Sequence, residues 1–280
     1  METTPLPFDN SGHAAHLEDG TLHSFRTLSM ELFDNSDKAI KDKNGNYDKD
    51  KIELFKAKEL FIFSDTGVGI YKKNLDKALT YYSKSNSDGI NRSGIGLKQV
   101  LNNLLPKGCL AFILSKTKDD EGEYDYCIKC LEKKECLEEV KEYGSLTSKT
   151  NMHTKISEII PDTGTIIIIN RQPFYLDDDK DDNSNANNIL RTCIENVKKR
   201  DNLQEDLEGI EDIQDMLKIL CDYPYSVIIN NKKIEHVKYL TDDYKKMFKL
   251  SIYRCDKNKY PQLYLKKEDG QYINMKYYFT

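Results

Sequence analysis

The sequence has no tryptophan, only 7 prolines and no long apolar run. Its longest apolar stretches are strand-sized, such as Ile166–Ile169, and none reaches the length that a membrane-spanning helix needs. The first residues lack the basic start and apolar stretch of a secretory signal. The 7 cysteines are an odd number, which favours reduced thiols over a disulfide framework. These absences predict a soluble intracellular protein, nuclear or cytoplasmic, without a membrane partner.

An excess of positive charge is also missing. The chain of 280 residues carries 42 Lys and Arg against 47 Asp and Glu, which gives a formal net charge of −5. A nucleic-acid-binding domain usually displays a basic face or stripe. The composition therefore gives DNA binding no support, although it leaves a local basic face open. The length suffices for one large domain or two smaller ones.

Helix-like and strand-like segments are present in an order that changes near residue 180. Residues 1–20 have no apolar period and are predicted to form an N-terminal arm. An amphipathic helix from Thr21 to about Lys43 opens a domain over residues 21–180, and an acidic, Asn-rich segment follows it. We predict a smaller α+β domain over residues 190–280, and this stretch can be only part of that domain. The predicted strands are Glu59–Asp65, Cys109–Lys116, Glu123–Leu131 and Gly164–Asn170, with a hairpin at Ser226–Val237.

The first chemical motif lies in the long predicted helix. Glu31 and Asn35 are four residues apart, so both side chains are expected on one helix face. A carboxylate there can polarise a water molecule as a general base, and an amide oxygen is a suitable ligand for Mg²⁺. A solvated polar face explains the same spacing equally well, so this motif alone leaves both interpretations open.

The second motif, Asp65-Thr66-Gly67-Val68-Gly69, directly follows a predicted buried strand. Gly67 and Gly69 allow the backbone to approach a ligand closely and to adopt angles that other residues avoid. Asp65 can accept a hydrogen bond from an exocyclic amine, which would select adenine over guanine. For this motif alone, an ordinary glycine-rich turn remains the stronger interpretation.

The third motif, Ser93–Lys98, contains Gly-x-Gly and opens a predicted helix after a polar segment. Backbone N–H groups at a helix start point toward anions, and the helix dipole favours phosphate. A simple loop before a helix is the alternative. The candidate phosphate-binding residues are Lys84, Gly94, Ile95, Gly96, Leu97 and Lys98.

The order of the three motifs, followed by the strand that begins at Gly164-Thr165, resembles that of the GHKL ATPases. This group includes DNA gyrase, MutL and the microrchidia (MORC) proteins, and the resemblance spans about residues 21–170. It implies an α/β (α+β) two-layer sandwich, the Bergerat fold, in which helices cover one face of a mixed sheet. It also implies that the chain binds ATP and Mg²⁺.

Carried over by position, the resemblance makes Glu31 the general base and Asn35 the Mg²⁺ ligand. Asp65 and Thr165 would bind adenine, with Gly67 and Gly69 shaping the turn. The glycines of the third motif would contact phosphates in a lid. The presence of Glu31 favours a hydrolase, because histidine kinases usually lack this glutamate.

The details are most similar to the MORC type. Tyr82–Ser85 resembles a MORC lid segment, and Ile219–Ile234 resembles the start of the transducer-like (S5-like) second domain. The chain departs from the group at Lys38, where an aspartate is usual, and at Asn91, where the lid often has glycine. The lysine that a second domain usually brings to the γ-phosphate has no assigned counterpart here.

The resemblance therefore implies slow, Mg²⁺-dependent ATP hydrolysis with lid closure and ATP-dependent pairing of two copies. The arm at residues 1–20 would be an exchange element in that homodimer. Two alternatives keep the fold: a nucleotide-sensing module without significant turnover, and the motor domain of a chaperone-like or DNA-compacting protein.

Cys127 and Cys130, with Cys136 and His153 nearby, invite a zinc interpretation. Residues three apart on a strand point to opposite faces, which suits a shared metal poorly. We therefore expect reduced thiols there.

Overall fold

The computed structural model consists of two compact units, residues 1–235 and residues 236–280. It describes residues 3–5, 24–43, 45, 47–79, 96–134, 137–140, 149–172, 182–220, 223–235, 248–252, 263–267 and 272–275. The described part of the first unit is α+β, with one large mixed sheet, as predicted. The second unit contains a three-stranded antiparallel sheet, β10 (Phe248–Ile252), β11 (Leu263–Lys267) and β12 (Tyr272–Met275).

The sheet of the first unit has the strand order β1-β6-β5-β4-β7-β3-β2-β8-β9. Neighbouring strands are antiparallel except for β2 and β8, which are parallel. The bounds are β1 (Thr3–Pro5), β2 (Lys51–Lys56), β3 (Leu60–Asp65), β4 (Leu110–Lys118), β5 (Tyr124–Lys133), β6 (Leu137–Val140), β7 (Gly164–Asn170), β8 (Ser226–Ile229) and β9 (Lys232–Lys233).

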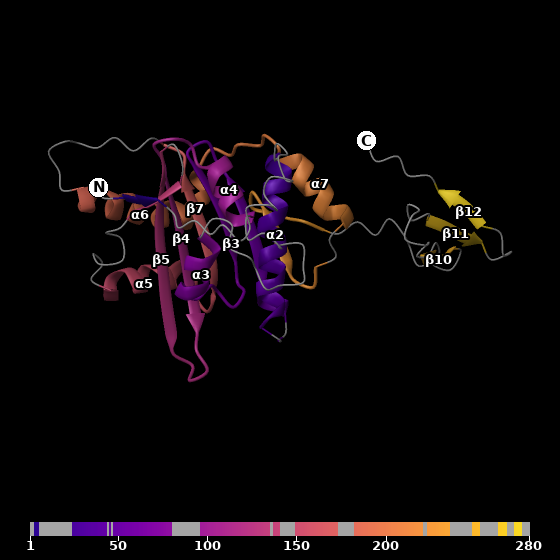
Figure 1. Cartoon of the computed structure of the whole chain (residues 1–280), viewed down its shortest axis with the longest axis horizontal. Coiled ribbons are helices and arrows are strands. Elements are labelled where there is room, and N and C mark those ends of the chain that lie inside the picture. Colours follow the sequence, from indigo (N-terminus) through magenta and orange to yellow (C-terminus); the bar gives the residue numbers. More distant parts are fainter. Residues whose placement is uncertain are drawn as a thin grey trace. The chain divides into compact units, whose positions relative to one another are not determined.

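The helices pack against both faces of this sheet (Figure 1). Helix α2 begins after Ser24, whose hydroxyl oxygen accepts a hydrogen bond from the N–H of Thr27, an N-cap contact. In the described residues, no helix is long and apolar enough to cross a membrane. The bounds are α2 (Phe25–Lys41), α3 (Lys72–Leu79), α4 (Gly96–Leu104), α5 (Lys149–Ile159), α6 (Asp182–Lys198) and α7 (Ile210–Leu220), with short 3₁₀ turns at Tyr47–Lys49 and Arg200–Asn202.

Two separate apolar clusters show that the prediction of helices on one face was wrong. Helices α2, α3, α4 and α7 pack on what we call the α2 face, and α5 and α6 pack on the α5 face. The cause lies in the strands. In β7, Ile167 and Ile169 belong to the first cluster, while Ile166 and Ile168 belong to the second. A strand that is apolar on both sides needs a cover on both sides.

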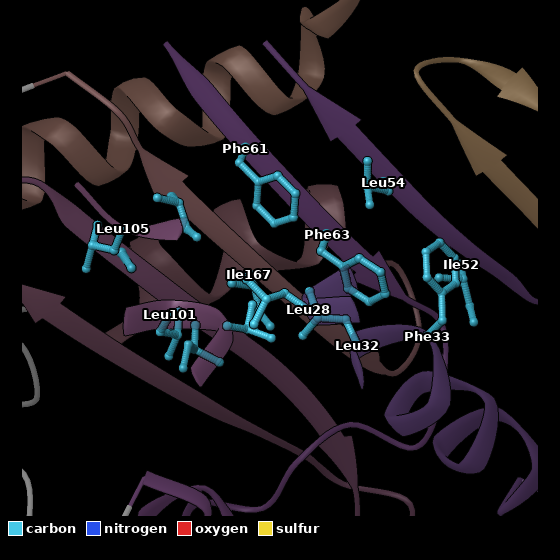
Figure 2. Close-up of a cluster of buried hydrophobic side chains, with 14 of the residues drawn as sticks. Leu28, Leu32, Phe33, Ile52, Leu54, Phe61, Phe63, Leu101, Leu105 and Ile167 are labelled. Atoms are coloured by element: carbon cyan, nitrogen blue, oxygen red, sulfur yellow. The ribbon is translucent and has the colours of Figure 1, made fainter. Parts of the chain in front are cut away.

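The α2-face cluster holds the long helix against the sheet. Figure 2 shows side chains of α2, β2, β3, β7 and α4 converging there. The rings of Phe33 on α2 and Phe63 on β3 meet edge to face, with centroids 5.2 Å apart. Aromatic pairs favour this arrangement. The contact fixes α2 over the end of β3, where the second motif begins.

The first unit extends further along the chain than predicted. We expected a boundary between about residues 177 and 190, but β8 pairs with β2 and α7 packs on the α2 face. Ion pairs tie the connecting segment down: Arg200 contacts Glu53 at 2.6 Å, and Asp206 contacts Arg171 at 2.9 Å. The compact unit ends at Glu235, so the boundary moves there. Composition marks the acidic segment, but it does not reveal that later residues return to the sheet.

Candidate functional site

Helix α2 carries Glu31 and Asn35, as predicted. Glu31 is part-buried and Asn35 is exposed. Buried residues of the same helix, including Leu28 and Leu32, hold it against the sheet. Because the two polar residues are four apart on a fixed helix, they lie on one side of it.

The carboxylate of Asp65, at the end of β3, is tied to α2. The hydroxyl of Ser36 donates to one of its oxygens at 3.1 Å, and the backbone N–H of Gly67 donates to the other at 2.8 Å. Burial raises the pKa of Asp65 to about 6, although bonds from Gly67, Ser36 and Thr165 and the charge of Lys43 act in the opposite direction. The carboxylate is therefore mostly ionised at neutral pH and is a strong hydrogen-bond acceptor.

Asp65 belongs to a polar row that crosses the sheet. It pairs in register with Thr165 on β7, Thr165 pairs with Ser115 on β4, and Ser115 pairs with Cys127 on β5. All four lie on the α2 face, because Phe63, Ile167 and Ile113, two residues away along their strands, belong to that core. We take this row as the base of the candidate site, because Ser36 of α2 donates a hydrogen bond to Asp65 at its end.

Ser115 is the central link of this row, and sequence reasoning missed it. Its hydroxyl accepts a hydrogen bond from the N–H of Ile70 at 2.6 Å, lies 3.3 Å from the carbonyl of Gly164, and is 3.5 Å from the hydroxyl of Thr165. The glycine turn, β4 and β7 therefore meet at one hydroxyl. The only signal in the sequence is a serine that ends an apolar run, and the register that aligns it with Asp65 is not visible there.

Close backbone packing explains the glycines around Asp65. A Cβ at Gly67 would lie 2.6 Å from the Cβ of Ala39 on α2, so this glycine allows approach to a helix. Gly69 has a φ of 77° and a Cβ there would lie 2.4 Å from the carbonyl oxygen of Lys116. A Cβ at Gly164 would lie 2.2 Å from the carbonyl oxygen of Asp65. Glycine is therefore required at Gly67 and Gly69 because the neighbouring helix and strand leave no room for a Cβ, which explains how these residues shape the turn.

A second set of polar contacts supports the turn from behind. The hydroxyl of Thr66 donates to Asp50 at 2.8 Å, and the ammonium of Lys43 contacts the same carboxylate at 3.0 Å. The hydroxyl of Thr163 donates to the carbonyl of Gly67 at 2.7 Å. These contacts leave the segment after β3 little freedom to move away from α2.

The third motif is described only in part. Lys84, Gly94 and Ile95 lie outside the described residues. Gly96 begins α4, and Leu97 packs against the α2-face core. Lys98 is 1 % exposed, and its ammonium donates to the carbonyl of Ala78 at the end of α3, at 2.9 Å. The structure therefore brings α2, Asp65 and Thr165 together, whereas the ammonium of Lys98 is engaged inside the protein.

The site extends along α2. Ser36, which holds Asp65, is five residues beyond Glu31, a distance of about 7.5 Å along the helix axis. Asn35 lies between these two levels. Asp65 offers a hydrogen-bond acceptor for a flat heterocycle at one end of the site, and Glu31 and Asn35 lie further along the helix. This arrangement suits a ligand that has a base at one end and a charged group at the other.

Cys127 and Cys130 on β5 are not placed to share a metal ion, and Cys136 lies outside the described residues. Cys127 belongs to the α2-face cluster and Cys130 to the α5-face cluster, so their thiols lie on opposite sides of the sheet. Burial raises the pKa of Cys127 to about 11. Across the part of the chain that the structure describes, no group of three or more His, Cys, Asp and Glu is placed to hold a metal ion.

Comparison with known proteins identifies no family for the chain. No family model matches it, and no curated protein matches it. Its function is therefore inferred from the order of the sequence motifs and from the geometry of the polar row and of α2.

Proposed function

We propose that the protein binds ATP with Mg²⁺ and hydrolyses it slowly, as a GHKL ATPase with the Bergerat fold, most similar to the MORC type. One observation carries the proposal: the carboxylate of Asp65, at the end of β3, is tied by a hydrogen bond from Ser36 to the helix that holds Glu31 and Asn35. A part-buried carboxylate with a raised pKa is a costly feature for a protein to keep and is typical of functional sites. The covering of both sheet faces differs from the two-layer form of the fold.

The polar row suits adenine. The carboxylate of Asp65 can accept a hydrogen bond from the exocyclic amine of adenine, whereas guanine presents an acceptor at that position. The hydroxyl of Thr165, beside it in register, offers a second polar contact. The residues present therefore fit the base, and they favour ATP over GTP.

The exposed side of α2 suits the phosphate end. Bound Mg²⁺ would neutralise phosphate oxygens, and the side-chain oxygen of Asn35 is a suitable protein ligand for it. Such ions commonly take one or two protein ligands, with water and phosphate supplying the rest. Glu31, one turn away on the same helix, would accept a proton from the attacking water.

An ATP-dependent homodimer belongs to the same proposal. Strand β1 pairs with β6, with Thr3 opposite Val140, so residues 3–5 can add a strand to this sheet edge. In a pair of copies the same segment would add to the edge of the partner. Light scattering with a non-hydrolysable ATP analogue tests this, and a protein that stays monomeric counts against pairing.

The decisive experiment combines calorimetry with phosphate release. We expect wild-type protein to bind ATP more tightly than GTP and to release phosphate slowly. Glu31→Ala should keep ATP affinity and lose about a hundredfold or more in turnover, the usual contribution of a general base. Asp65→Asn should lose ATP binding. Glu211→Ala and Asp212→Asn, which change exposed residues of α7, are matched controls that should behave as wild type.

Each other outcome has a meaning. Binding without turnover in the wild type would indicate a nucleotide sensor. Turnover that survives in Glu31→Ala would remove the assigned base. Absence of binding by the wild type would overturn the proposed function as a whole.

A further inference from the structure

Helices α3 and α4 meet end to end at one buried side chain. Lys98, in the first turn of α4, places its ammonium 2.9 Å from the carbonyl oxygen of Ala78, in the last turn of α3. Its side chain is among the largest fully buried ones in the described residues. Burial lowers the pKa of Lys98 to about 8, so the ammonium still carries its charge at neutral pH.

Helix electrostatics favour this placement. The last four carbonyl groups of a helix have no partner within the helix, and the helix C-terminus is negative. A cation in the first turn of α4 is unfavourable for α4, but its ammonium at the end of α3 satisfies an orphan carbonyl there. Helix α3 spans only 8 residues, a length at which helical stability depends on tertiary contacts.

Other contacts couple α3 to the candidate site. Leu75 and Leu79 are buried in the α2-face core, and Asp76 contacts Lys129 of β5 at 2.7 Å. The helix directly follows the segment from Asp65 to Tyr71, whose end is held by the Ile70 to Ser115 bond. A shift of α3 would therefore pull on the turn that follows Asp65.

We propose that Lys98 is a positioning residue that fixes the last turn of α3 against α4, and thereby the segment after Asp65, and that it does not contact the phosphates. The part of this inference that concerns nucleotide rests on the proposed function. The contact with α3 does not. A lysine that binds phosphate should be accessible to solvent in the free protein and should affect ATP more than AMP. A positioning lysine should be inaccessible and should affect both nucleotides equally.

Reductive methylation of the wild-type protein tests accessibility without any substitution. Mass spectrometry after treatment with formaldehyde and a borane reports which lysines react, with and without Mg²⁺·ATP. We expect Lys98 to stay unmodified in both conditions, while Lys73, exposed on α3, reacts in both. Methylation of Lys98 in the nucleotide-free protein would overturn the proposal, whether or not ATP then protects it.

The variant Lys98→Met removes the ammonium and keeps much of the side-chain volume, and Lys73→Met is the matched control. We expect hydrogen exchange over residues 72–79 to accelerate about tenfold or more in Lys98→Met only. Affinities for ATP and for AMP should fall by the same factor, because a shifted turn affects the base common to both. Unchanged exchange, or an ATP affinity that falls about tenfold more than the AMP affinity, would overturn the proposal.

The two proposals can fail separately. If the wild type binds neither ATP nor AMP, the proposed function fails, and methylation and hydrogen exchange still decide the contact with α3. If Lys98→Met does not fold, methylation of the wild type decides. If nucleotide binds but Lys98 proves reactive, only the positioning role is lost.

Discussion

The two faces of the sheet are built from the same strands but packed for different purposes. On the α5 face, residues such as Phe112, Ile166 and Ile168 form a continuous apolar cluster with α5 and α6. On the α2 face the apolar cluster stops at the row that runs from Asp65 through Thr165 to Ser115. The α5 face also buries the charged side chains of Glu53 and Lys116, but only the α2 face places its polar row against the helix that carries Glu31 and Asn35. The following substitutions test this division, from the largest expected effect to the smallest.

Removing an aromatic ring from each face should separate stability from binding. Phe112→Ala on the α5 face and Phe63→Ala on the α2 face each delete a buried ring, at an expected cost of about 3–5 kcal/mol in unfolding free energy. Only Phe63→Ala should also weaken nucleotide binding, because Phe63 lies two residues before Asp65. Urea unfolding and calorimetry measure the two effects. Equal loss of binding by the folded protein in both variants would contradict the division.

Asp65→Asn should gain stability relative to the wild type as pH rises, while it abolishes binding. The raised pKa means that the folded state disfavours the charged form, so wild-type stability falls as pH rises from 3.8 through about 6. At about 1.4 kcal/mol per pKa unit, the variant should gain up to about 3 kcal/mol on the wild type between pH 4 and pH 7. Urea unfolding across this range measures it. A gain that shrinks as pH rises would show that the carboxylate stabilises the fold.

Ser115→Ala should cost about 1–3 kcal/mol, because it leaves the N–H of Ile70 without its acceptor inside the protein. Nucleotide binding should weaken as well, since the glycine turn loses its link to β4. Ser29→Ala is the matched control. Ser29 is also fully buried, but its hydroxyl donates to the Phe25 carbonyl one turn earlier in the same helix. Its removal therefore leaves no N–H group without an acceptor. Equal effects of the two substitutions would remove the special role of Ser115.

Lys41→Ala should have the smallest effect. Its ammonium pairs with Asp37 at 2.7 Å across one turn of α2, and the lysine is exposed. Such pairs contribute no more than about 0.5 kcal/mol. Thermal unfolding at low and high salt measures the difference. A loss above 1.4 kcal/mol, a tenfold change in the unfolding equilibrium, would show that this exposed pair contributes more to stability than such pairs usually do.

Local pattern was enough to predict α2, four central strands and one hairpin of the first unit. The apolar period over 21–43 predicted α2, and the structure confirms the helix from Phe25 to Lys41. The strands β3, β4, β5 and β7 and the hairpin of β8 and β9 lie where predicted, with Asn230 and Asn231 at positive φ in its turn. These features depend on residues close together in the chain, so periodicity and turn chemistry reveal them.

Long-range features were predicted less well. The run of isoleucines in β7 already implied burial on both faces, yet helices were expected on only one. The acidic segment after residue 177 was interpreted as a domain boundary, because nothing local indicates that β8 pairs with β2. The assignment of Lys98 to phosphate came from its place after two glycines, and local pattern gave no sign that its ammonium would donate to the carbonyl of Ala78, twenty residues earlier.

The sequence by itself determined where α2, β3, β4, β5, β7 and the hairpin of β8 and β9 form, which residues of α2 share a side, and that an aspartate ends a buried strand. It also supplied the motif order on which the ATPase proposal rests. Only the tertiary structure decided that Asp65, Thr165 and Ser115 share one row, that Ser36 ties the row to α2, and that residues 190–235 belong to the first unit. The physical reason is that strand register and side-chain partners are set by contacts between distant segments, which no local period encodes.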